Sequence, residues 1–491
     1  MKLKEFRVLR FRNIIDSEPI PVEPDVTVLV GKNESGKTAI LEALYRLNPV
    51  YTGSFSLNED YPRWQLVVDR RKGETAKQMP IEAIFALEDA DRGAIEGVLG
   101  RGVLQDGDVA VSRNYGDPRI LSLRFVTPLN QAAVVANIFE SLRLSDGAKG
   151  LLSEAHTLAE LQVAAQEAKL KAAAQENAEA ITVEIDGAAN KAKAILGDSD
   201  GETEVAKKLL LARLPRFFYF SSYHILPGRI DLDALAASAN EEPAASPDQT
   251  ARSLLRLAQT DPQTLMGEQY EERKAELEAV SNDLSRQVFE HWTQNPDLRV
   301  EFDVDRTIKA DGEGVPRIVS NHLEVRVQDR RHDFTNNFSQ RSSGFRWFFS
   351  FLAAFAEFEG TGKKVIVLLD EPGLALHAKA QADFLRFINE RLAKGTQVIY
   401  TTHSPFMVET DRLHRARIVQ DNGPDKGATA TTDVLLVDHD SVFPLQAALG
   451  YDLSQHLMIG DANLLVEGSS DFVYLDCISR FLRGSARDAL E

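Results

Sequence analysis

Eight consecutive residues have the composition and spacing of a loop that binds phosphate groups: Gly31-Lys32-Asn33-Glu34-Ser35-Gly36-Lys37-Thr38. A β-branched run (26–30) precedes them and a helix-forming run (39–44) follows, which is the context that such a loop needs. The glycines would let the backbone approach an anion, and the amides and dipole at the helix start would attract it. Lys37 would reach the β- and γ-phosphates of a nucleotide, and the Thr38 hydroxyl would ligate Mg²⁺. A glycine-rich turn with a chance Lys-Thr pair is the alternative.

A pair of carboxylates supplies what hydrolysis would need in addition to the loop. Asp370 and Glu371 follow the wholly apolar run 365–369, which predicts a strand buried on both faces of a parallel sheet. Asp370 would hold Mg²⁺ through water, and Glu371 would polarise the attacking water. The alternative is a buried strand that ends in an acidic turn.

Two further segments lie where a nucleotide site could use them. His403 follows the next predicted strand (397–402), and the carboxyl ends of such strands bind ligands in open α/β sheets. His403 could therefore contact a γ-phosphate and sense its loss, although a lone histidine is more often structural. Ser342-Ser343-Gly344 opens an apolar helix over 345–358 and is either a helix cap or a phosphate-binding helix start.

Length and composition limit the classes of protein to consider. A chain of 491 residues predicts roughly two to four domains, and 43% hydrophobic with 26% charged residues is ordinary for a globular protein. The net charge of −18 argues against coating nucleic acid by bulk charge, but it permits a local basic patch. One cysteine, Cys477, excludes an internal disulfide and a Cys-based zinc site. No signal peptide and no run of about 18 apolar residues is present, so we expect a cytoplasmic protein with no membrane partner.

The middle of the chain differs from its two ends in composition and in the secondary structure that it predicts. Alternating or apolar runs predict strands early in the chain (3–14, 81–87, 109–113 and 121–125), and we interpret the arginines of the first run as a solvated strand face. Residues 158–193 are rich in Ala, Glu, Gln and Lys and predict one long helix, with coiled coil as a further option. A buried strand is predicted at 214–220, helix with breaks from about 249 to 294, and strands again from 298.

Taken together and in this order, the phosphate loop, Ser342-Ser343-Gly344, Asp370-Glu371 and His403 resemble an ABC-type ATPase head. Within that group the wording of 370–377 (DEPGLALH) and 401–406 (TTHSPF) resembles the RecF/SMC-like heads of the OLD (overcoming lysogenization defect) family. The resemblance implies an α/β fold, ATP and Mg²⁺ as cofactors, and a homodimer or higher oligomer. Two ATP molecules would lie between the heads, each closed by the signature segment (342–344) of the other subunit.

The resemblance covers about residues 1–130 and 298–475, and it leaves two details open. The signature segment reads Arg-Ser-Ser-Gly-Phe instead of Leu-Ser-Gly-Gly-Gln, so either serine could meet the phosphate, and no glutamine-loop residue can be placed. Lys37 and Asp370 lie 370 − 37 = 333 positions apart, more than a compact head requires. We therefore expect four segments: an amino-terminal head lobe (1–130), a helical, dimerising insertion (131–297), a carboxy-terminal head lobe (298–445), and a Toprim-like start (446–491).

The last segment resembles the first strand of a Toprim domain, the metal-dependent nuclease module that follows the ATPase in OLD proteins. Asn463 and the apolar residues 464–466 lead to Glu467, which would be a metal ligand with Asp471 as its neighbour. A strand, a turn and a capped helix is the plain alternative. The later Asp-x-Asp is missing after Asp471, and 438–440 precede Glu467 in the wrong order. We expect either a piece of a longer protein, a degenerate module, or one completed by a partner protein.

The sequence thus predicts an ATPase that regulates a Toprim nuclease in DNA metabolism or anti-phage defence, with DNA as a partner. As it stands the chain should hydrolyse ATP without cutting DNA, because the nuclease site lacks carboxylates. Three alternatives remain: a structural SMC/RecF-like DNA clamp, a transporter ATPase subunit, and a sensor ATPase that controls a nuclease or other effector partner.

Overall fold

The computed structural model describes residues 1–105, 107–173, 177–238, 246–257, 260–266, 270–291, 297–310, 316–358, 364–374, 376–433, 470–471, 474–475, 477–479 and 481. It divides into two compact units. Unit 1 comprises Met1–Leu9, Ser54–Tyr61 and Gln65–Arg216, and unit 2 comprises Arg10–Gly53, Pro62–Trp64 and Phe217–Glu491. The fold class is α/β, as predicted. No helix in the described part of the chain has both the length and the apolar composition that crossing a bilayer requires.

Unit 1 combines an antiparallel sheet with a group of helices. Its strands pair in the order β1 (Lys2–Phe11), β5 (Ile81–Ala86), β6 (Asp108–Arg113) and β7 (Ser122–Phe125). In β5 buried residues alternate with partly exposed ones, and in β7 with exposed ones, which is the period-2 pattern of a half-buried strand. The helices are α2 (Leu57–Asp60), most of α3 (Arg63–Arg71), α4 (Asp89–Leu99), α5 (Gln131–Leu142), α6 (Asp146–Leu152), α7 (Leu158–Ala172), α8 (Ala178–Leu196) and α9 (Glu202–Leu211).

The single long helix predicted over 158–193 is wrong, because the structure divides it into α7 and α8. The two helices pack against each other along buried leucine, isoleucine and alanine side chains. Each begins with a residue suited to a helix start, a Thr157-Glu160 capping box for α7 and Asn177 for α8. An alanine-rich sequence favours helix on both sides of the reversal and so conceals where it lies.

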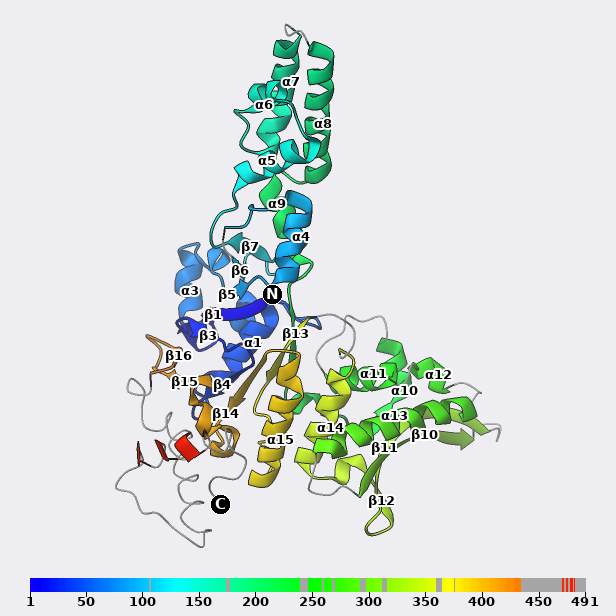
Figure 1. Cartoon of the computed structure of the whole chain (residues 1–491). Helices are drawn as coiled ribbons and strands as arrows, with labels where there is room; N and C mark the ends of the chain where they lie inside the picture. The colour runs from blue at the N-terminus through cyan, green and yellow to red at the C-terminus, as the bar shows by residue number, and fades with distance from the viewer. Residues whose placement is uncertain are drawn as a thin grey trace. The chain divides into compact units, whose positions relative to one another are not determined.

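Unit 2 is built on a six-stranded sheet in the order β16-β15-β4-β14-β13-β8. The strands β15, β4, β14 and β13 run parallel to one another, whereas β16 pairs antiparallel with β15. The strands β4, β14 and β13 lie side by side in Figure 1. Every residue of those three strands is buried, as expected for strands covered on both faces. Their bounds are β4 (Val26–Val30), β8 (Arg216–Phe220), β13 (Val365–Leu369), β14 (Val398–Thr402), β15 (Ala416–Asp421) and β16 (Ala428–Thr431).

The strand β8 lies within the segment that the sequence assigned to a helical insertion (131–297). It forms an edge of the unit 2 sheet, so that segment does not consist of helices alone. The prediction of a buried strand at 214–220 is confirmed.

The remaining elements of unit 2 flank this sheet or form a second one. The long hairpin of β10 (Leu298–Ala310) and β11 (Pro316–Asp329) pairs with β9 (Arg229–Asp231) and β12 (Phe334–Asn337). The short strands β2 (Ile14–Asp16) and β3 (Ile20–Pro21) belong to neither of these sheets but to the hydrogen-bonded sheet that contains β1. The helices are α1 (Lys37–Leu47), α10 (Leu232–Ala237), α11 (Pro247–Leu257), α12 (Pro262–Met266), α13 (Tyr270–His291), α14 (Ser343–Phe355) and α15 (Ala378–Glu390).

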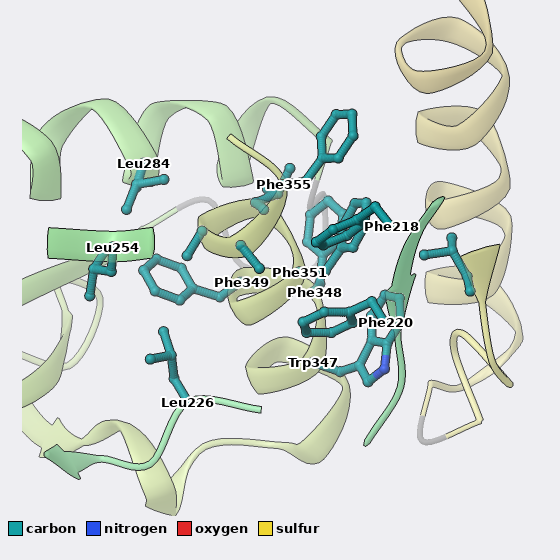
Figure 2. Close-up of a cluster of buried hydrophobic side chains, with 14 of the residues drawn as sticks. Phe218, Phe220, Leu226, Leu254, Leu284, Trp347, Phe348, Phe349, Phe351 and Phe355 are labelled. Carbon is teal, nitrogen blue, oxygen red and sulfur yellow. The ribbon is translucent and has the colours of Figure 1, made fainter. Parts of the chain in front are cut away.

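Aromatic side chains fill the core around α14. Figure 2 shows Phe218 and Phe220 of β8 facing the aromatic residues of that helix. The Phe220 ring lies 5.3 Å from Trp347 and 5.6 Å from Phe351, both edge to face. Each such pair adds about 0.5–1.5 kcal/mol to the hydrophobic stabilisation. This packing fixes β8 against the helix that begins at the signature segment.

Candidate active site

The phosphate loop connects β4 to α1 and admits side chains at neither of its glycines. A Cβ at Gly31 would lie 2.3 Å from the carbonyl oxygen of Val419. Gly36 has φ +102°, in the left-handed region that favours glycine, and a Cβ there would lie 2.6 Å from Ala428. The chain therefore bends closely around the space that follows β4, as a phosphate-binding loop requires.

Lys37, the first residue of α1, spans its own loop. Its Nζ donates hydrogen bonds to the carbonyl oxygens of Gly31 and Lys32, each at 2.8 Å, and lies 3.5 Å from Oε1 of Glu371. Only 5% of the side chain is exposed. Burial lowers the pKa of the Lys37 ammonium, and the nearby Glu371 carboxylate acts against that shift. The cation is thus held at the mouth of the loop, where an anionic ligand would meet it.

Three hydroxyl groups donate hydrogen bonds to the carboxylate of Asp370. Thr38 and Thr401 both reach Oδ1, at 3.0 and 2.7 Å, and Tyr219 reaches Oδ2 at 3.0 Å. Burial raises the pKa of Asp370 above its ordinary value, and the three hydroxyl groups act in the opposite direction. Asp370 and Thr38, which the sequence places in one site, are thus in direct contact.

Glu371 adopts a conformation that is uncommon for a residue with a side chain. Its φ is +47°, in the left-handed region, which costs of order 1 kcal/mol or more and is typical of functional sites. The backbone N–H of Glu371 donates a hydrogen bond to the Thr401 hydroxyl at 2.8 Å. The Oε2 atom of Glu371 lies 2.9 Å from Nδ1 of His403. The unusual backbone thus directs one carboxylate toward both Lys37 and His403.

A cavity of about 390 Å³ lies over this arrangement. Ser35 lines it, and the buried hydroxyl of Ser35 has no hydrogen-bond partner within the described part of the chain. An orphaned buried donor beside an ammonium group and a helix start suits an anionic ligand such as a phosphate chain. The complete lining is Arg12, Asn13, Asn33, Glu34, Ser35, Gly36, Lys37, Thr38, Ala39 and Glu371.

The oxygen atoms near this cavity also suit Mg²⁺. Within the described residues no group of three or more His, Cys, Asp or Glu side chains could hold a metal on its own. Mg²⁺ in nucleotide sites takes only one or two protein ligands and completes its shell with phosphate and water. The hydroxyl of Thr38 and the carboxylate of Asp370 provide such a pair. The donor set therefore fits the ion that the sequence predicts.

The signature segment is described but contributes no residue to the lining of this cavity. Ser342 caps α14, and its hydroxyl accepts a hydrogen bond from the N–H of Phe345 at 3.4 Å. Ser342 and Ser343 are exposed, whereas Gly344 is buried. Within one chain, these serines and the phosphate loop do not share the cavity.

The proposed Toprim residues fall almost wholly outside the described part of the chain. Glu467 and residues 438–440 lie outside it, and Asp471 lies within it as an exposed helical residue. The metal site predicted from these residues stays a prediction.

Four residues of the site were not singled out from the sequence. Thr401 and Tyr219 contact Asp370, and Arg12 and Asn13 line the cavity. Arg12 makes two hydrogen bonds to the carboxylate of Glu42, at 2.9 and 2.6 Å, and its side chain is 38% exposed. The run Thr401-Thr402-His403 carried a signal for Thr401, whereas nothing local marks Arg12.

Comparison with known protein families finds two ATPase-domain models. A model described as an AAA ATPase domain matches residues 1–86, and one described as "AAA domain, putative AbiEii toxin, Type IV TA system" matches residues 233–409. The phosphate loop falls in the first match, and the signature segment, Asp370, Glu371 and His403 fall in the second. Both halves of the candidate site thus lie within ATPase-domain matches.

Two curated proteins resemble short stretches of the chain. An uncharacterised protein of Methanocaldococcus jannaschii is 28% identical over 119 residues, which are 23% of this chain and 30% of that protein. The OLD nuclease of Thermus scotoductus is 35% identical over 74 residues, 15% of this chain and 14% of the nuclease. The matched stretches therefore span less than a third of either relative.

Solved structures with some similarity include heads of SMC proteins. An SMC head bound to the C-terminal winged-helix domain of ScpA has a TM-score of 0.39 at 12% identity, covering 88% of this chain and 98% of that one. The SMC head of Thermotoga maritima has a TM-score of 0.32 at 12% identity, with the same two coverages.

Proposed function

We propose that this chain is an ABC-type ATPase that binds ATP with Mg²⁺ at the phosphate loop and hydrolyses it. The observation that carries the proposal is the convergence of Lys37, Thr38, Asp370 and Glu371 at the carboxyl ends of β4 and β13. The carboxyl edge of an open α/β sheet is where such folds bind ligands. The buried hydroxyl of Ser35, which has no partner among the residues that the structure describes, supports a phosphate ligand in particular.

Each of these residues has a separate role in the proposed reaction. Lys37 would bind the β- and γ-phosphates, and Thr38 with Asp370 would hold Mg²⁺, whose chemistry there would be to neutralise charge on the phosphates. Glu371 orients and polarises the attacking water, and His403 holds the Glu371 carboxylate at 2.9 Å. Phosphate oxygens would compete with Glu371 for Lys37 and so free the carboxylate to act on water.

Replacement of Glu371 by Gln tests this assignment. ATP binding should persist while turnover falls by about 100-fold or more, because only the proton acceptor is lost. Binding of a fluorescent ATP analogue and phosphate release would be measured on the same preparation. Glu390→Gln, an exposed carboxylate at the end of α15, is the matched control. If Glu371→Gln turns over ATP at the parental rate, Glu371 is not the base.

We further propose that the site is completed by a second copy of the chain. Ser342 and Ser343 are exposed at the start of α14 and do not line the cavity of their own chain, so they are available to a nucleotide on a partner subunit. Mixing Lys37→Ala with Ser343→Ala chains would place one intact composite site in each mixed dimer. Activity should then rise and fall with the mixing ratio; zero activity at every ratio contradicts a shared site.

The role best suited to this ATPase is that of an OLD-type protein that acts on DNA, in DNA metabolism or anti-phage defence. The local identity to an OLD nuclease supports it, together with the strand-turn pattern that ends at Glu467 and Asp471. The test is plasmid cutting with Mg²⁺ or Mn²⁺ by this chain joined to a complete Toprim module, in which Glu467→Ala should abolish cutting without changing ATP turnover. DNA binding without cutting by that longer protein would favour the SMC/RecF-like structural role.

A second candidate is a sensor ATPase that controls a toxin-like effector partner. The description of the family model that matches residues 233–409 favours it. If this candidate is right, expression of the chain together with its neighbouring genes should arrest cell growth, and the arrest should depend on Glu371. An OLD-type nuclease should instead leave damaged DNA.

A further inference from the structure

The strand β8 presents its residues alternately to two faces of the sheet. Phe218 and Phe220 face α14 in the core, as Figure 2 shows. Because successive side chains of a strand point to opposite faces, Tyr219 is directed the other way. The ring of Tyr219 indeed lies 5.6 Å from that of Tyr45, a residue of α1. The edge strand thus delivers one polar aromatic side chain to the helix that begins at Lys37.

This side chain ends at the metal-site carboxylate. The Tyr219 hydroxyl donates to Oδ2 of Asp370 at 3.0 Å, whereas both threonine hydroxyls donate to Oδ1. The backbone N–H of Asp370 also donates to the carbonyl oxygen of Phe220 at 3.0 Å, which fixes β8 beside the end of β13. Among the described residues, Tyr219 is therefore the hydrogen-bond donor that holds the second carboxylate oxygen.

The ring of Tyr219 is itself held in place on two sides. Besides Tyr45, His224 lies edge-on at 5.7 Å with an interplanar angle of 88°. The backbone N–H of Ser221 donates to Nδ1 of His224 at 2.9 Å and fixes that imidazole. Tyr219 is thus braced between the phosphate-loop helix and the turn after β8, so its hydroxyl has little freedom to move.

We propose that Tyr219 is a positioning residue that fixes the plane of the Asp370 carboxylate for Mg²⁺. The terminal torsion of an aspartate is broad, so hydrogen bonds to one oxygen alone leave the carboxylate free to rotate. A rigid donor on Oδ2 removes that rotation and orients Oδ1 toward Thr38. This inference rests on the proposed function, since it concerns the metal of the same site.

The change Tyr219→Phe removes the hydroxyl and keeps the ring. We expect the Mg²⁺ concentration for half-maximal ATP turnover to rise about tenfold, the effect of one hydrogen bond to a charged group. Maximal turnover at saturating Mg²⁺ should change by less than about threefold, and ATP affinity in EDTA should not change. Loss of packing alone would lower stability without this selective dependence on the metal.

Tyr400→Phe is the matched control. Its hydroxyl is also buried in the same sheet and donates to the carbonyl oxygen of Met407 at 2.6 Å, away from Asp370. It should lose stability with no change in Mg²⁺ dependence. In an Asp370→Asn background, Tyr219→Phe should have no further effect on the Mg²⁺ dependence of ATP binding, because coupled residues are not additive.

The outcomes separate this inference from the proposed function. An unchanged Mg²⁺ dependence in Tyr219→Phe, in a wild type that hydrolyses ATP, overturns the role of Tyr219 alone. If the wild type binds ATP with Mg²⁺ but does not hydrolyse it, the proposed function fails, and the Mg²⁺ dependence of binding still decides the role of Tyr219. A wild type that binds no ATP in the presence of Mg²⁺ overturns both.

Discussion

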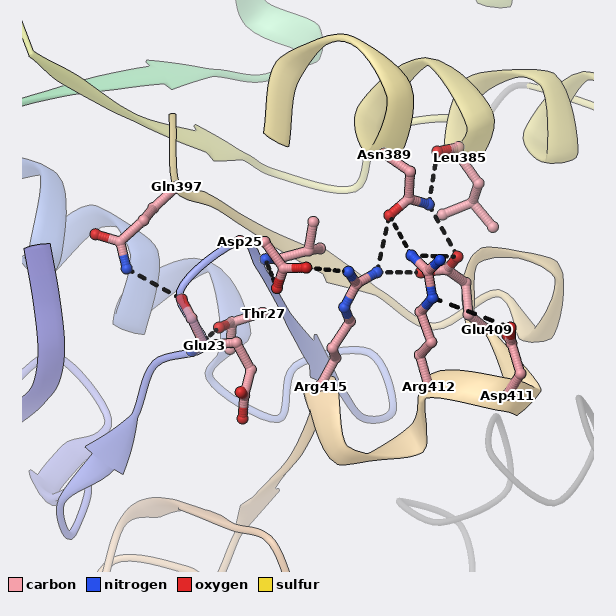
Figure 3. A network of polar contacts seen from close by, with 11 residues as sticks. Glu23, Asp25, Thr27, Leu385, Asn389, Gln397, Glu409, Asp411, Arg412 and Arg415 are labelled. Atoms are coloured by element: carbon pink, nitrogen blue, oxygen red, sulfur yellow. Dashed lines mark hydrogen bonds and ion pairs between the residues drawn. The ribbon is translucent and has the colours of Figure 1, made fainter. Parts of the chain in front are cut away.

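The same parallel strands carry a cluster of polar residues at each end, and the two clusters are built differently. At the amino ends of β4, β14 and β15, the buried Arg415 forms ion pairs with Asp25 and Glu409 and donates to Asn389 (Figure 3). Gln397 donates to the backbone of Glu23 in the same region. This amino-end cluster links three strands and α15 through contacts among its own members.

At the carboxyl ends the polar residues are arranged around a cavity. Glu371 has a left-handed backbone, and the buried hydroxyl of Ser35 has no partner in the described residues. The amino-end cluster also holds a buried atom with no partner among the described residues, Nε of Arg415, but Arg415 does not line the cavity. Hydrogen-bonding capacity left open beside a cavity is available to a ligand. The difference indicates that one end of the sheet maintains the structure and the other end is reserved for chemistry.

The two aspartates make the same distinction through their pKa values. Burial acts to raise the pKa of Asp25, but hydrogen bonds from the Val26 N–H and Arg415 outweigh it, so the pKa lies below its ordinary value of 3.8. Burial raises the pKa of Asp370 above the same value. The surroundings of Asp25 therefore favour its ionised form. The surroundings of Asp370 disfavour the ionised form, so an ionised Asp370 lowers the stability of the fold.

The largest effect should follow removal of the cation at the carboxyl end. Lys37→Ala should weaken ATP binding by about 30-fold to 3,000-fold, the range for truncating one partner of a buried charge pair. The melting temperature should hardly change, because Lys37 serves the ligand and not the sheet. Lys394→Ala, an exposed lysine, is the control. Unfolding of Lys37→Ala at the assay temperature would show that this end is also structural.

Removal of the cation at the amino end should have the opposite consequence. Arg415→Leu should cost about 3 kcal/mol of unfolding free energy, because Asp25 and Glu409 lose their buried partner. ATP affinity per folded molecule should stay as in the parent. Arg412→Leu, 41% exposed in the same cluster, should cost less than about 1 kcal/mol by denaturant unfolding. Equal losses for the two arginines would remove the special role of Arg415.

Much of the carboxyl end could be predicted from the sequence, because its signals are local. The apolar strand before Asp370 and the glycine spacing around Lys37 each place a residue at a strand end without knowledge of the fold. Parallel strands then bring those ends to one edge.

Residues joined only by the fold could not be found in this way. Tyr219 lies 151 positions from Asp370 in a run of aromatic residues that predicts a buried strand and nothing more. Arg415 lies 390 positions from Asp25, and neither has a motif around it. The amino-end cluster therefore went unpredicted, since structural ion pairs require no fixed local spacing.

The smallest changes in stability should follow replacement of Asp25 or Asp370 by asparagine. These two variants also give the sharpest test of the comparison between the two ends of the sheet. Asp25→Asn should destabilise the protein by about 1 kcal/mol at neutral pH, since its partner is buried but the aspartate is half-exposed. Asp370→Asn should stabilise it by about 1 kcal/mol while abolishing ATP turnover, because active-site charges are commonly held at a cost in stability. Urea unfolding of each variant beside the wild type gives both differences.

The pH dependence of those differences follows from the direction of each pKa shift. The folded pKa of Asp25 is lowered, so its contribution to stability is present above 3.8 and is lost as the pH falls through the folded value. The pKa of Asp370 in the folded protein is raised, so its ionised carboxylate lowers the free energy of unfolding. This destabilisation is complete above the folded pKa and disappears as the pH falls to 3.8. On acidification, the stabilisation that Asp370→Asn brings should therefore disappear first. The destabilisation caused by Asp25→Asn should persist to lower pH. If both substitutions destabilise the protein at neutral pH, the carboxyl end carries structural weight as well, and the distinction between the two ends fails.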